Sequence, residues 1–208
     1  MTKFIPGRQL GFTLGGRVGA ETKLEVFVDF TCPFSQRIFR RLREEVKPYY
    51  GPKLDVVIMP FSQPWHPSSA MVHECFHSAC MSVSPDKSED ILSATFDFAL
   101  EKYNDVDAMD KSRKQVHLEC ADLYAAQGVP KETFLENLAL PPEDKRENKN
   151  PGVPATRLVK FYTKAARQVG GLHVSPTCRV NGVTVDTSSG WSLDQWREFL
   201  DPLLAGNL

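Results

Sequence analysis

A cysteine and a serine three residues apart, directly after an apolar run, form the first candidate reactive site. Residues 27–30 are followed by Thr31-Cys32-Pro33-Phe34-Ser35, and proline suits the first turn of a helix because its missing N–H has no partner there. A strand that turns into a helix at Cys32 places the sulfur at the positive end of the helix dipole, which stabilises a thiolate. Cys32 is therefore the predicted nucleophile.

Ser35 stands where a second cysteine would complete a dithiol pair. In a dithiol pair the second sulfur attacks the mixed disulfide and releases the substrate, and a serine hydroxyl cannot do this. Cys32 can still form a mixed disulfide that an external thiol such as glutathione resolves. Ser35 Oγ can donate a hydrogen bond to the thiolate. The pattern predicts a monothiol route through these two residues.

Three of the other cysteines are weak candidates for a resolving thiol. Cys75 and Cys80 are five residues apart on one predicted helix and do not share a face, and Cys120 lies on a helix far from the reactive site. The odd number of cysteines, their irregular spacing and the length of 208 residues favour reduced thiols in a reducing compartment.

A second pattern with catalytic potential is His73-Glu74-Cys75-Phe76-His77. On a helix the two histidines would share a face and could bind zinc, with Glu74 as the general base. Cys80, one turn beyond His77, is the nearest candidate for a third ligand, but no later Gly-x-x-His follows. We therefore predict no metal site, and interpret the pattern as a chance motif on a helix that packs against the core.

His66 is a separate candidate, because it precedes the same predicted helix and could contact a ligand. The preferred interpretation is a loop histidine beside a buried Trp65. A ligand contact is the alternative.

The composition excludes several classes of function. The 25 basic and 26 acidic residues give a net charge of −1, which offers no basic surplus for nucleic acid or an anionic membrane. No run approaches the ~18 apolar residues of a membrane span, and the first residues lack the apolar core of a signal peptide. We predict a soluble, cytoplasmic protein with no nucleic-acid or membrane partner and leave its oligomeric state open.

The hydrophobic pattern predicts an α/β chain with a long helical block. In chain order we expect a short hairpin or looped strand at 8–20 and strands at 23–30 and 53–60, joined by a helix that starts at Pro33 and is ended by Pro48 and Gly51-Pro52. A loop and cap at His66-Pro67-Ser68-Ser69 then precede a helix that ends at about 81, and further helices follow at 84–100, 112–126, 131–138 and 158–169, with a loop at 140–154. The chain ends with strands at 177–180 and 183–186 and a helix capped by Ser192. Asn181-Gly182 between the last two strands predicts a tight hairpin.

Two segments make this chain resemble the thioredoxin superfamily, and within it the DsbA-like branch of thiol–disulfide oxidoreductases, which also includes kappa-class glutathione transferases. Residues 28–35 are similar to the strand and Cys-Pro-aromatic-Cys box of that family, with serine in the last position. Residues 174–182 are similar to its cis-proline loop, followed by a strand and an Asn-Gly turn. The resemblance implies an α/β thioredoxin-like fold with a helical insertion between the second core strand and the cis-proline loop.

The resemblance also implies a domain division. Residues 1–65 and 171–208 would form a discontinuous thioredoxin-like domain, and residues 66–170 an inserted helical subdomain. Many relatives carry a buried acid six residues before the nucleophile, where this chain has Val26. Asp29 matches a common feature of the branch, although the proton-transfer role of that acid is not assumed for it.

Five further roles follow from the same resemblance. Pro176 is the candidate cis-proline and Ser175 the contact residue before it, while Pro33 and Phe34 complete the surface that binds a substrate or thiol. Cys178 points into the core, where it packs as a small hydrophobic residue.

Three functions remain open. The first is a thiol–disulfide oxidoreductase that acts through Cys32 by a monothiol route on a protein or glutathione disulfide. It needs no cofactor except glutathione as a co-substrate. The second is a glutathione-binding transferase or isomerase of the kappa-class type. The third is a catalytically degenerate thioredoxin-fold binding module.

Overall fold

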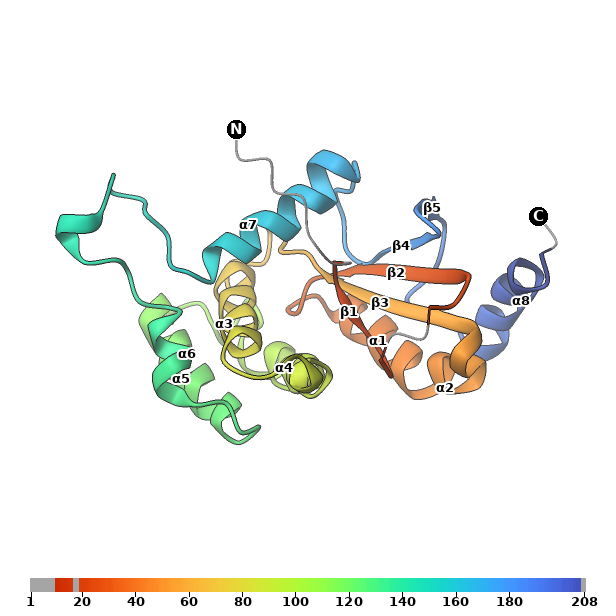
Figure 1. Cartoon of the computed structure of the whole chain (residues 1–208), viewed down its shortest axis with the longest axis horizontal. Helices are drawn as coiled ribbons and strands as arrows, with labels where there is room; N and C mark the ends of the chain where they lie inside the picture. The colour runs from red at the N-terminus through yellow and green to blue at the C-terminus, as the bar shows by residue number, and fades with distance from the viewer. Residues whose placement is uncertain (1–9, 17–18, 207–208) are drawn as a thin grey trace.

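The computed structural model describes residues 10–16 and 19–206, whose strands form one five-stranded sheet in the order β1-β3-β2-β4-β5 (Figure 1). The strands are β1 (Phe12–Thr13), β2 (Thr22–Val28), β3 (Leu54–Pro60), β4 (Thr177–Val180) and β5 (Val183–Val185). β2 and β3 are parallel and the other pairs are antiparallel. The predicted first strand is thus a two-residue strand, and residues 8, 9, 17 and 18 of that segment lie outside the described residues.

The helix after β2 confirms the predicted start at Pro33 and the predicted end at Gly51-Pro52, but Pro48 does not end it. α1 (Pro33–Arg41) continues through a π-helical segment (Leu42–Val46) into α2 (Lys47–Tyr50). Pro48 lies inside α2 and does not end the helix. It has no N–H to donate, and in the preceding wider turn the N–H of Lys47 bonds to the carbonyl of Leu42, so the chain adapts to the proline without breaking.

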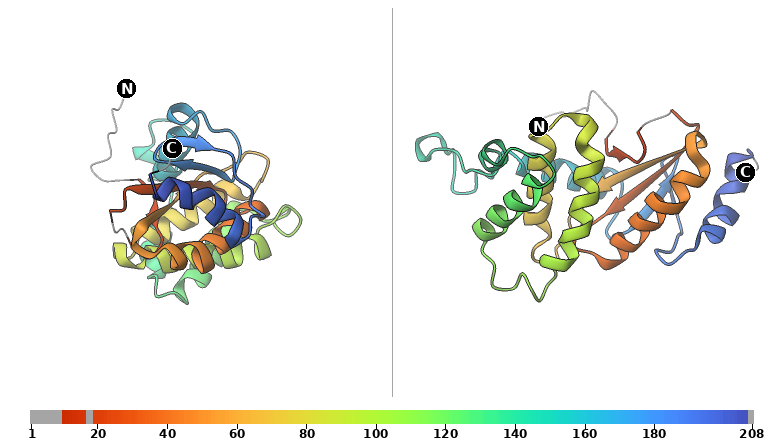
Figure 2. Two further views of the ribbon diagram at one scale, coloured as in Figure 1. Left: turned by 90° about the vertical axis from the view of Figure 1, so that its right-hand side faces the viewer. Right: turned by 90° about the horizontal axis from the view of Figure 1, so that it is seen from below.

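The helices between β3 and β4 form the predicted helical block. They are α3 (Ser69–Met81), α4 (Ser88–Lys102), α5 (Arg113–Ala125), α6 (Lys131–Glu136) and α7 (Thr156–Lys164), the last continuing as a π-helical segment (Ala165–Val169). Short 3₁₀ turns occur at Gly51–Lys53, Pro85–Lys87 and Glu143–Lys145. Figures 1 and 2 show α3–α6 gathered beyond one end of the sheet and the final helix α8 (Leu193–Leu204) at the other.

Both faces of the sheet are covered. Leu24, Val26 and Val28 of β2 point into the larger core, which also contains buried side chains of α1, α3, α4 and α8. Phe27 points to the opposite face, where it joins Val57 and Met59 of β3 beneath α7. All seven residues of β3 are buried, as expected for a strand covered on both sides. The domain boundaries stay a prediction, and α7 itself packs on the sheet.

Of the two predicted helix caps, the one at Ser192 is confirmed and the one at residues 66–69 is not. Ser192 at the start of α8 and Ser112 at the start of α5 each form a capping box with a glutamine three residues later. The predicted cap at residues 66–69 is wrong, because Ser68 Oγ donates to the carbonyl of Tyr103 and caps nothing. Within the described part of the chain, no helix is both long and apolar enough to cross a bilayer.

Candidate active site

The predicted nucleophile lies at the junction of β2 and α1. Cys32 is the residue that precedes the first turn of α1 and has an extended backbone conformation. Its N–H donates to the carbonyl of Asp29 at 3.2 Å, and its own carbonyl accepts the N–H of Gln36 at 3.0 Å. The side chain is 4% exposed. These bonds fix the sulfur at the amino end of the helix, as predicted.

The second predicted segment meets this junction across 143 residues of sequence. The Ser175–Pro176 peptide bond is cis, the conformation that the resemblance implies. The Cys32 thiol donates a weak hydrogen bond to the carbonyl of Ser175, with Sγ and O 3.6 Å apart. The structure therefore brings Cys32, Ser175 and Pro176 together, while their roles in binding a substrate stay predictions.

Ser35 is fully buried beneath this contact. Its Oγ accepts the N–H of Asp29 at 3.2 Å. The hydrogen bond predicted from Ser35 to the Cys32 thiolate is not among those of the described residues. Since Oγ acts as an acceptor toward Asp29, the hydroxyl proton remains available for donation.

Asp29 makes more contacts at the site than the sequence analysis predicted. Its carboxylate is fully buried and accepts two hydrogen bonds from Thr31, one from N–H and one from the hydroxyl, both at 2.8 Å. The other oxygen accepts the N–H of Gln63 and the hydroxyl of Ser69, both at 2.7 Å. His73 Nε2 lies 3.8 Å from Oδ1, which is too long for a good hydrogen bond.

The electrostatics of this carboxylate follow from its partners. Burial by itself raises the pKa of Asp29, but the interaction with His73 and the hydrogen bonds from Ser69 and Thr31 outweigh it and lower the pKa below its ordinary value. Asp29 is therefore an anion at neutral pH. The sequence did not predict Gln63 and Ser69 as partners of Asp29, because they lie 34 and 40 residues further along the chain. A local sequence pattern does not indicate a contact between residues so far apart.

The His73–His77 segment is structural. Both histidines are buried on α3, but His73 packs on Phe30 with ring centroids 4.5 Å apart, whereas His77 stacks on Tyr162 at 5.1 Å. Glu74 points elsewhere and binds Arg113 through two hydrogen bonds of 3.0 and 2.8 Å. No group of residues that could hold a metal ion occurs within residues 10–16 and 19–206.

Apolar side chains of the segments that carry the site, and of the loop after β3, are exposed. Phe34 is 54% and Trp65 51% exposed, so the predicted burial of Trp65 is wrong. Its neighbour His66 instead reaches Asp105, with Nδ1 and Oδ1 3.5 Å apart. Val174, next to Ser175, is 57% exposed. The guanidinium of Arg37, another residue of α1, lies 5.8 Å from the centre of the Phe34 ring.

The other four cysteines are free and lie in or against the core. Cys178 pairs across the sheet with Val26, and burial raises the pKa of its thiol to about 11. Burial also raises the pKa of Cys75 and of Cys80 above the ordinary range of a thiol. Cys120 is buried on α5, as predicted. Raised pKa values keep the thiols of Cys75, Cys80 and Cys178 protonated and unreactive, so these three are poor candidates for a nucleophile or a resolving thiol.

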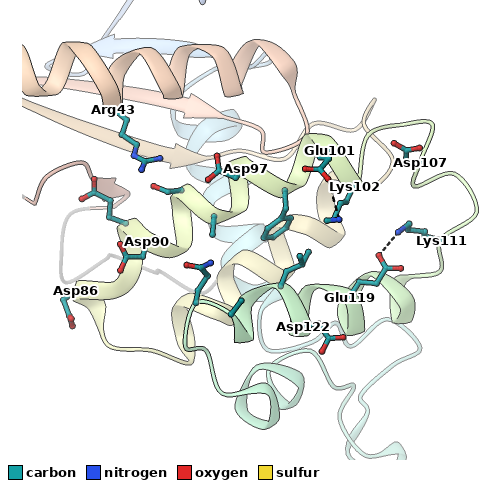
Figure 3. Close-up of a pocket in the computed structure, with 17 residues that line it drawn as sticks. Arg43, Asp86, Asp90, Asp97, Glu101, Lys102, Asp107, Lys111, Glu119 and Asp122 are labelled. Carbon is teal, nitrogen blue, oxygen red and sulfur yellow. Dashed lines mark hydrogen bonds and ion pairs between the residues drawn. The ribbon is translucent and has the colours of Figure 1, made fainter.

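A groove of about 1310 Å³ runs along α4 and α5 and carries many acidic side chains (Figure 3). None of the predicted site residues lines it. Several of its charges are neutralised locally, as in the pair of Lys111 and Glu119, whose Nζ and Oε2 atoms are 2.6 Å apart. The groove is separate from the cysteine site.

Known structures show the same architecture. A provisionally assigned protein-disulfide isomerase from Pseudomonas syringae is similar with a TM-score of 0.68 and 26% identity, over 91% of this chain and 97% of that one. The catalytic domain of Proteus mirabilis ScsC matches at 0.60 and 14% identity, over 94% and 89%. MdbA, a thiol–disulfide oxidoreductase from Actinomyces oris, matches at 0.59 and 16% identity, over 90% and 82%.

The fold is thioredoxin-like. It carries the helical insertion of DsbA-like proteins between β3 and the loop of Pro176. No protein-family model and no curated protein sequence matches the chain. In this thioredoxin-like frame, Cys32 and the cis-proline loop occupy the two adjacent positions that the resemblance implies.

Proposed function

We propose that this protein is a thiol–disulfide oxidoreductase that acts through Cys32 alone. The observation that carries the proposal is the 3.6 Å contact between Cys32 Sγ and the carbonyl before the cis-proline. It joins a sulfur at a helix N-terminus to the loop beside it. Support comes from the similar structures, among which are a provisionally assigned protein-disulfide isomerase and a thiol–disulfide oxidoreductase.

The proposed reaction has two exchange steps. The Cys32 thiolate attacks one sulfur of a substrate disulfide, so that a new S–S bond forms, the old one breaks and the second substrate sulfur leaves as a thiolate. A molecule of glutathione, as its thiolate, then attacks the mixed disulfide on the substrate sulfur and releases the Cys32 thiolate. Ser35 cannot resolve the intermediate, and its hydroxyl proton is proposed to stabilise the Cys32 thiolate instead.

The substrate is proposed to be a protein or glutathione disulfide. Phe34, Trp65 and Val174 are exposed, and they are proposed to form an apolar border of the site that suits a polypeptide with accessible side chains. Pro33, Ser175 and Pro176 are proposed to contact the same ligand. The five free cysteines support a reducing compartment such as the cytoplasm, which cell fractionation with an antibody to the protein would test.

Reaction with glutathione disulfide tests the nucleophile. The reduced, folded protein is expected to gain one glutathione on Cys32, located by peptide mass spectrometry, and to catalyse reduction of a small mixed disulfide by glutathione. Cys32→Ser should abolish both, whereas Cys80→Ser, which removes a half-buried thiol, should retain both. A folded protein with no adduct on Cys32, or an adduct without turnover, would overturn the proposal.

Two variants separate the competing activities. Oxidised by glutathione disulfide, which is reduced to two glutathione thiols, Ser35→Cys should form an intramolecular disulfide with Cys32 and transfer it to a reduced protein substrate, because a second sulfur restores the missing step. Conjugation of an electrophile by glutathione that survives Cys32→Ser would instead identify a transferase of the kappa-class type.

A further inference from the structure

Asp29 joins the turn that carries Cys32 to two segments from elsewhere in the chain. On the near side its carbonyl accepts the N–H of Cys32, and its N–H donates to Ser35 Oγ. On the far side its carboxylate accepts from Gln63, in the loop after β3, and from Ser69, the first residue of α3. One residue therefore touches both ends of the Cys-x-x-Ser box and the start of the helical block.

The carboxylate is fully committed to these contacts. A carboxylate offers about four lone-pair positions, and Thr31, Gln63 and Ser69 supply four donors. Two of the donors are backbone N–H groups, which cannot rotate to find another acceptor. Burying an anion is costly unless all its positions are satisfied, so the geometry tolerates little movement of the loop or of the turn.

We propose that Asp29 is a positioning residue for Cys32, whose carboxylate fastens the Thr31–Cys32 turn to the loop after β3 and to α3. The proposal rests on the proposed function in one respect, that Cys32 is the reacting group. Asp29 does not touch the sulfur through its carboxylate, so its effect passes through the backbone. The acid that relatives carry six residues before the cysteine is replaced by Val26, which lies in the core.

Asp29→Asn is the direct test. The amide NH₂ must replace one oxygen, where it faces the backbone N–H of either Thr31 or Gln63, and neither donor can turn away. Because misplacement by about 1 Å can cost on the order of a hundredfold in rate, we expect the rate constant of Cys32 with glutathione disulfide to fall about tenfold or more.

Asp55→Asn is the matched control. Asp55 is also buried, at 3% exposure, and accepts the N–H groups of Gly19 and Ala20. It lies at the beginning of β3, the end of the sheet opposite the Cys32 turn. Asp55→Asn should lower stability but leave the rate constant of the folded protein within about twofold of wild type, since it removes a buried carboxylate without disturbing the turn.

Two readouts separate positioning from general destabilisation. Each variant is compared under conditions where unfolding curves show it to be folded, and again in denaturant, where all rate constants should agree. In nuclear magnetic resonance spectra, Asp29→Asn should shift the amide signals of Thr31 and Gln63 but not those of Gly19 and Ala20. A folded Asp29→Asn protein that reacts within about twofold of wild type would overturn the proposal.

If Asp29→Asn does not fold, two serines of α3 provide a second test of the positioning role. Ser69→Ala removes one donor to Asp29, whereas Ser78→Ala removes an equally buried hydroxyl that donates to the carbonyl of Phe134 at 2.6 Å. Only Ser69→Ala should slow Cys32, by roughly twofold or more; equal rates in the two variants would refute positioning. An unreactive Cys32 in the wild-type protein would instead refute the proposed function.

Discussion

Two buried carboxylates, Asp29 in the turn after β2 and Glu74 on α3, have similar electrostatics and different structural partners. Asp29 holds the turn and loop at the edge of the sheet, and its charge faces His73. Glu74, which follows His73 on α3, faces the helical block, where it binds Arg113 of α5 and Thr156 of α7. Of these two adjacent residues of α3, His73 therefore contacts the carboxylate at the cysteine site, and Glu74 joins helices of the insertion.

The pKa values of the two groups follow from the same balance. Burial raises the pKa of Glu74, but His117, Thr156 and Arg113 outweigh it and lower the pKa below its ordinary value, as His73, Ser69 and Thr31 do for Asp29. A strongly held buried anion is therefore no indication of a reactive site by itself. What distinguishes Asp29 is its attachment to Cys32.

The largest expected effect comes from Glu74→Ala. The substitution leaves Arg113 without its carboxylate partner, so we expect the free energy of unfolding to fall by about 2–3 kcal/mol. This loss is smaller than for a fully buried ion pair because the Arg113 side chain is half exposed. The rate constant of Cys32 with glutathione disulfide should be unchanged in the folded variant. Denaturant titration and thiol kinetics measure the two quantities. If the rate constant of Cys32 fell together with the free energy of unfolding, Glu74 would affect the cysteine site as Asp29 does, and the proposed difference between them would be wrong.

Acid should destabilise the protein through both carboxylates. Their folded pKa values are below the unfolded ones, so the stability they contribute is complete above the unfolded pKa of about 4 and is lost as pH falls through the folded values. Unfolding free energies measured from pH 7 to pH 2 should fall more steeply for wild type than for the Asp29→Asn, Glu74→Gln double variant. Equal slopes would contradict these pKa shifts.

His77→Phe should make stability less sensitive to pH. Burial, with the nearby His73, lowers the pKa of His77 well below its ordinary value, so the native state keeps it neutral. Its contribution to stability is present above the unfolded pKa of about 6.5 and declines below it. The stacking on Tyr162 is retained by phenylalanine. The difference in unfolding free energy between pH 7 and pH 5 should shrink in the variant, and an unchanged difference would contradict the lowered pKa of His77.

The smallest expected effect is that of Thr156→Val. The hydroxyl of Thr156 donates to Glu74 at 2.6 Å, and its loss should cost about 1 kcal/mol because Arg113 still holds the carboxylate. Thermal unfolding provides the measurement. Thr31→Val, which removes the corresponding hydroxyl from Asp29, should cost about the same but also slow Cys32. If both variants slowed Cys32 equally, Glu74 would belong to the cysteine site as well.

Local patterns predicted the regular elements well because their causes are local. The apolar run before Cys32, the proline after it and the turn at Asn181-Gly182 each specify backbone geometry within a few residues. Gly51-Pro52 ends the first helix as predicted, but Pro48 was mispredicted as a helix end, since a π-helical segment accommodated it. The exposure of Trp65 was mispredicted too, because burial depends on what packs nearby.

By itself the sequence determined the α/β element order, the position of Cys32 at the start of a helix and the absence of a second sulfur at Ser35. Only the tertiary structure decided which groups meet there. The contacts of Asp29 with Gln63 and Ser69, and of Cys32 with Ser175, join residues 34 to 143 positions apart. Such contacts arise because the parallel strands β2 and β3 end, and the antiparallel strand β4 begins, at one edge of the sheet. A periodic pattern along the chain carries no information about that edge.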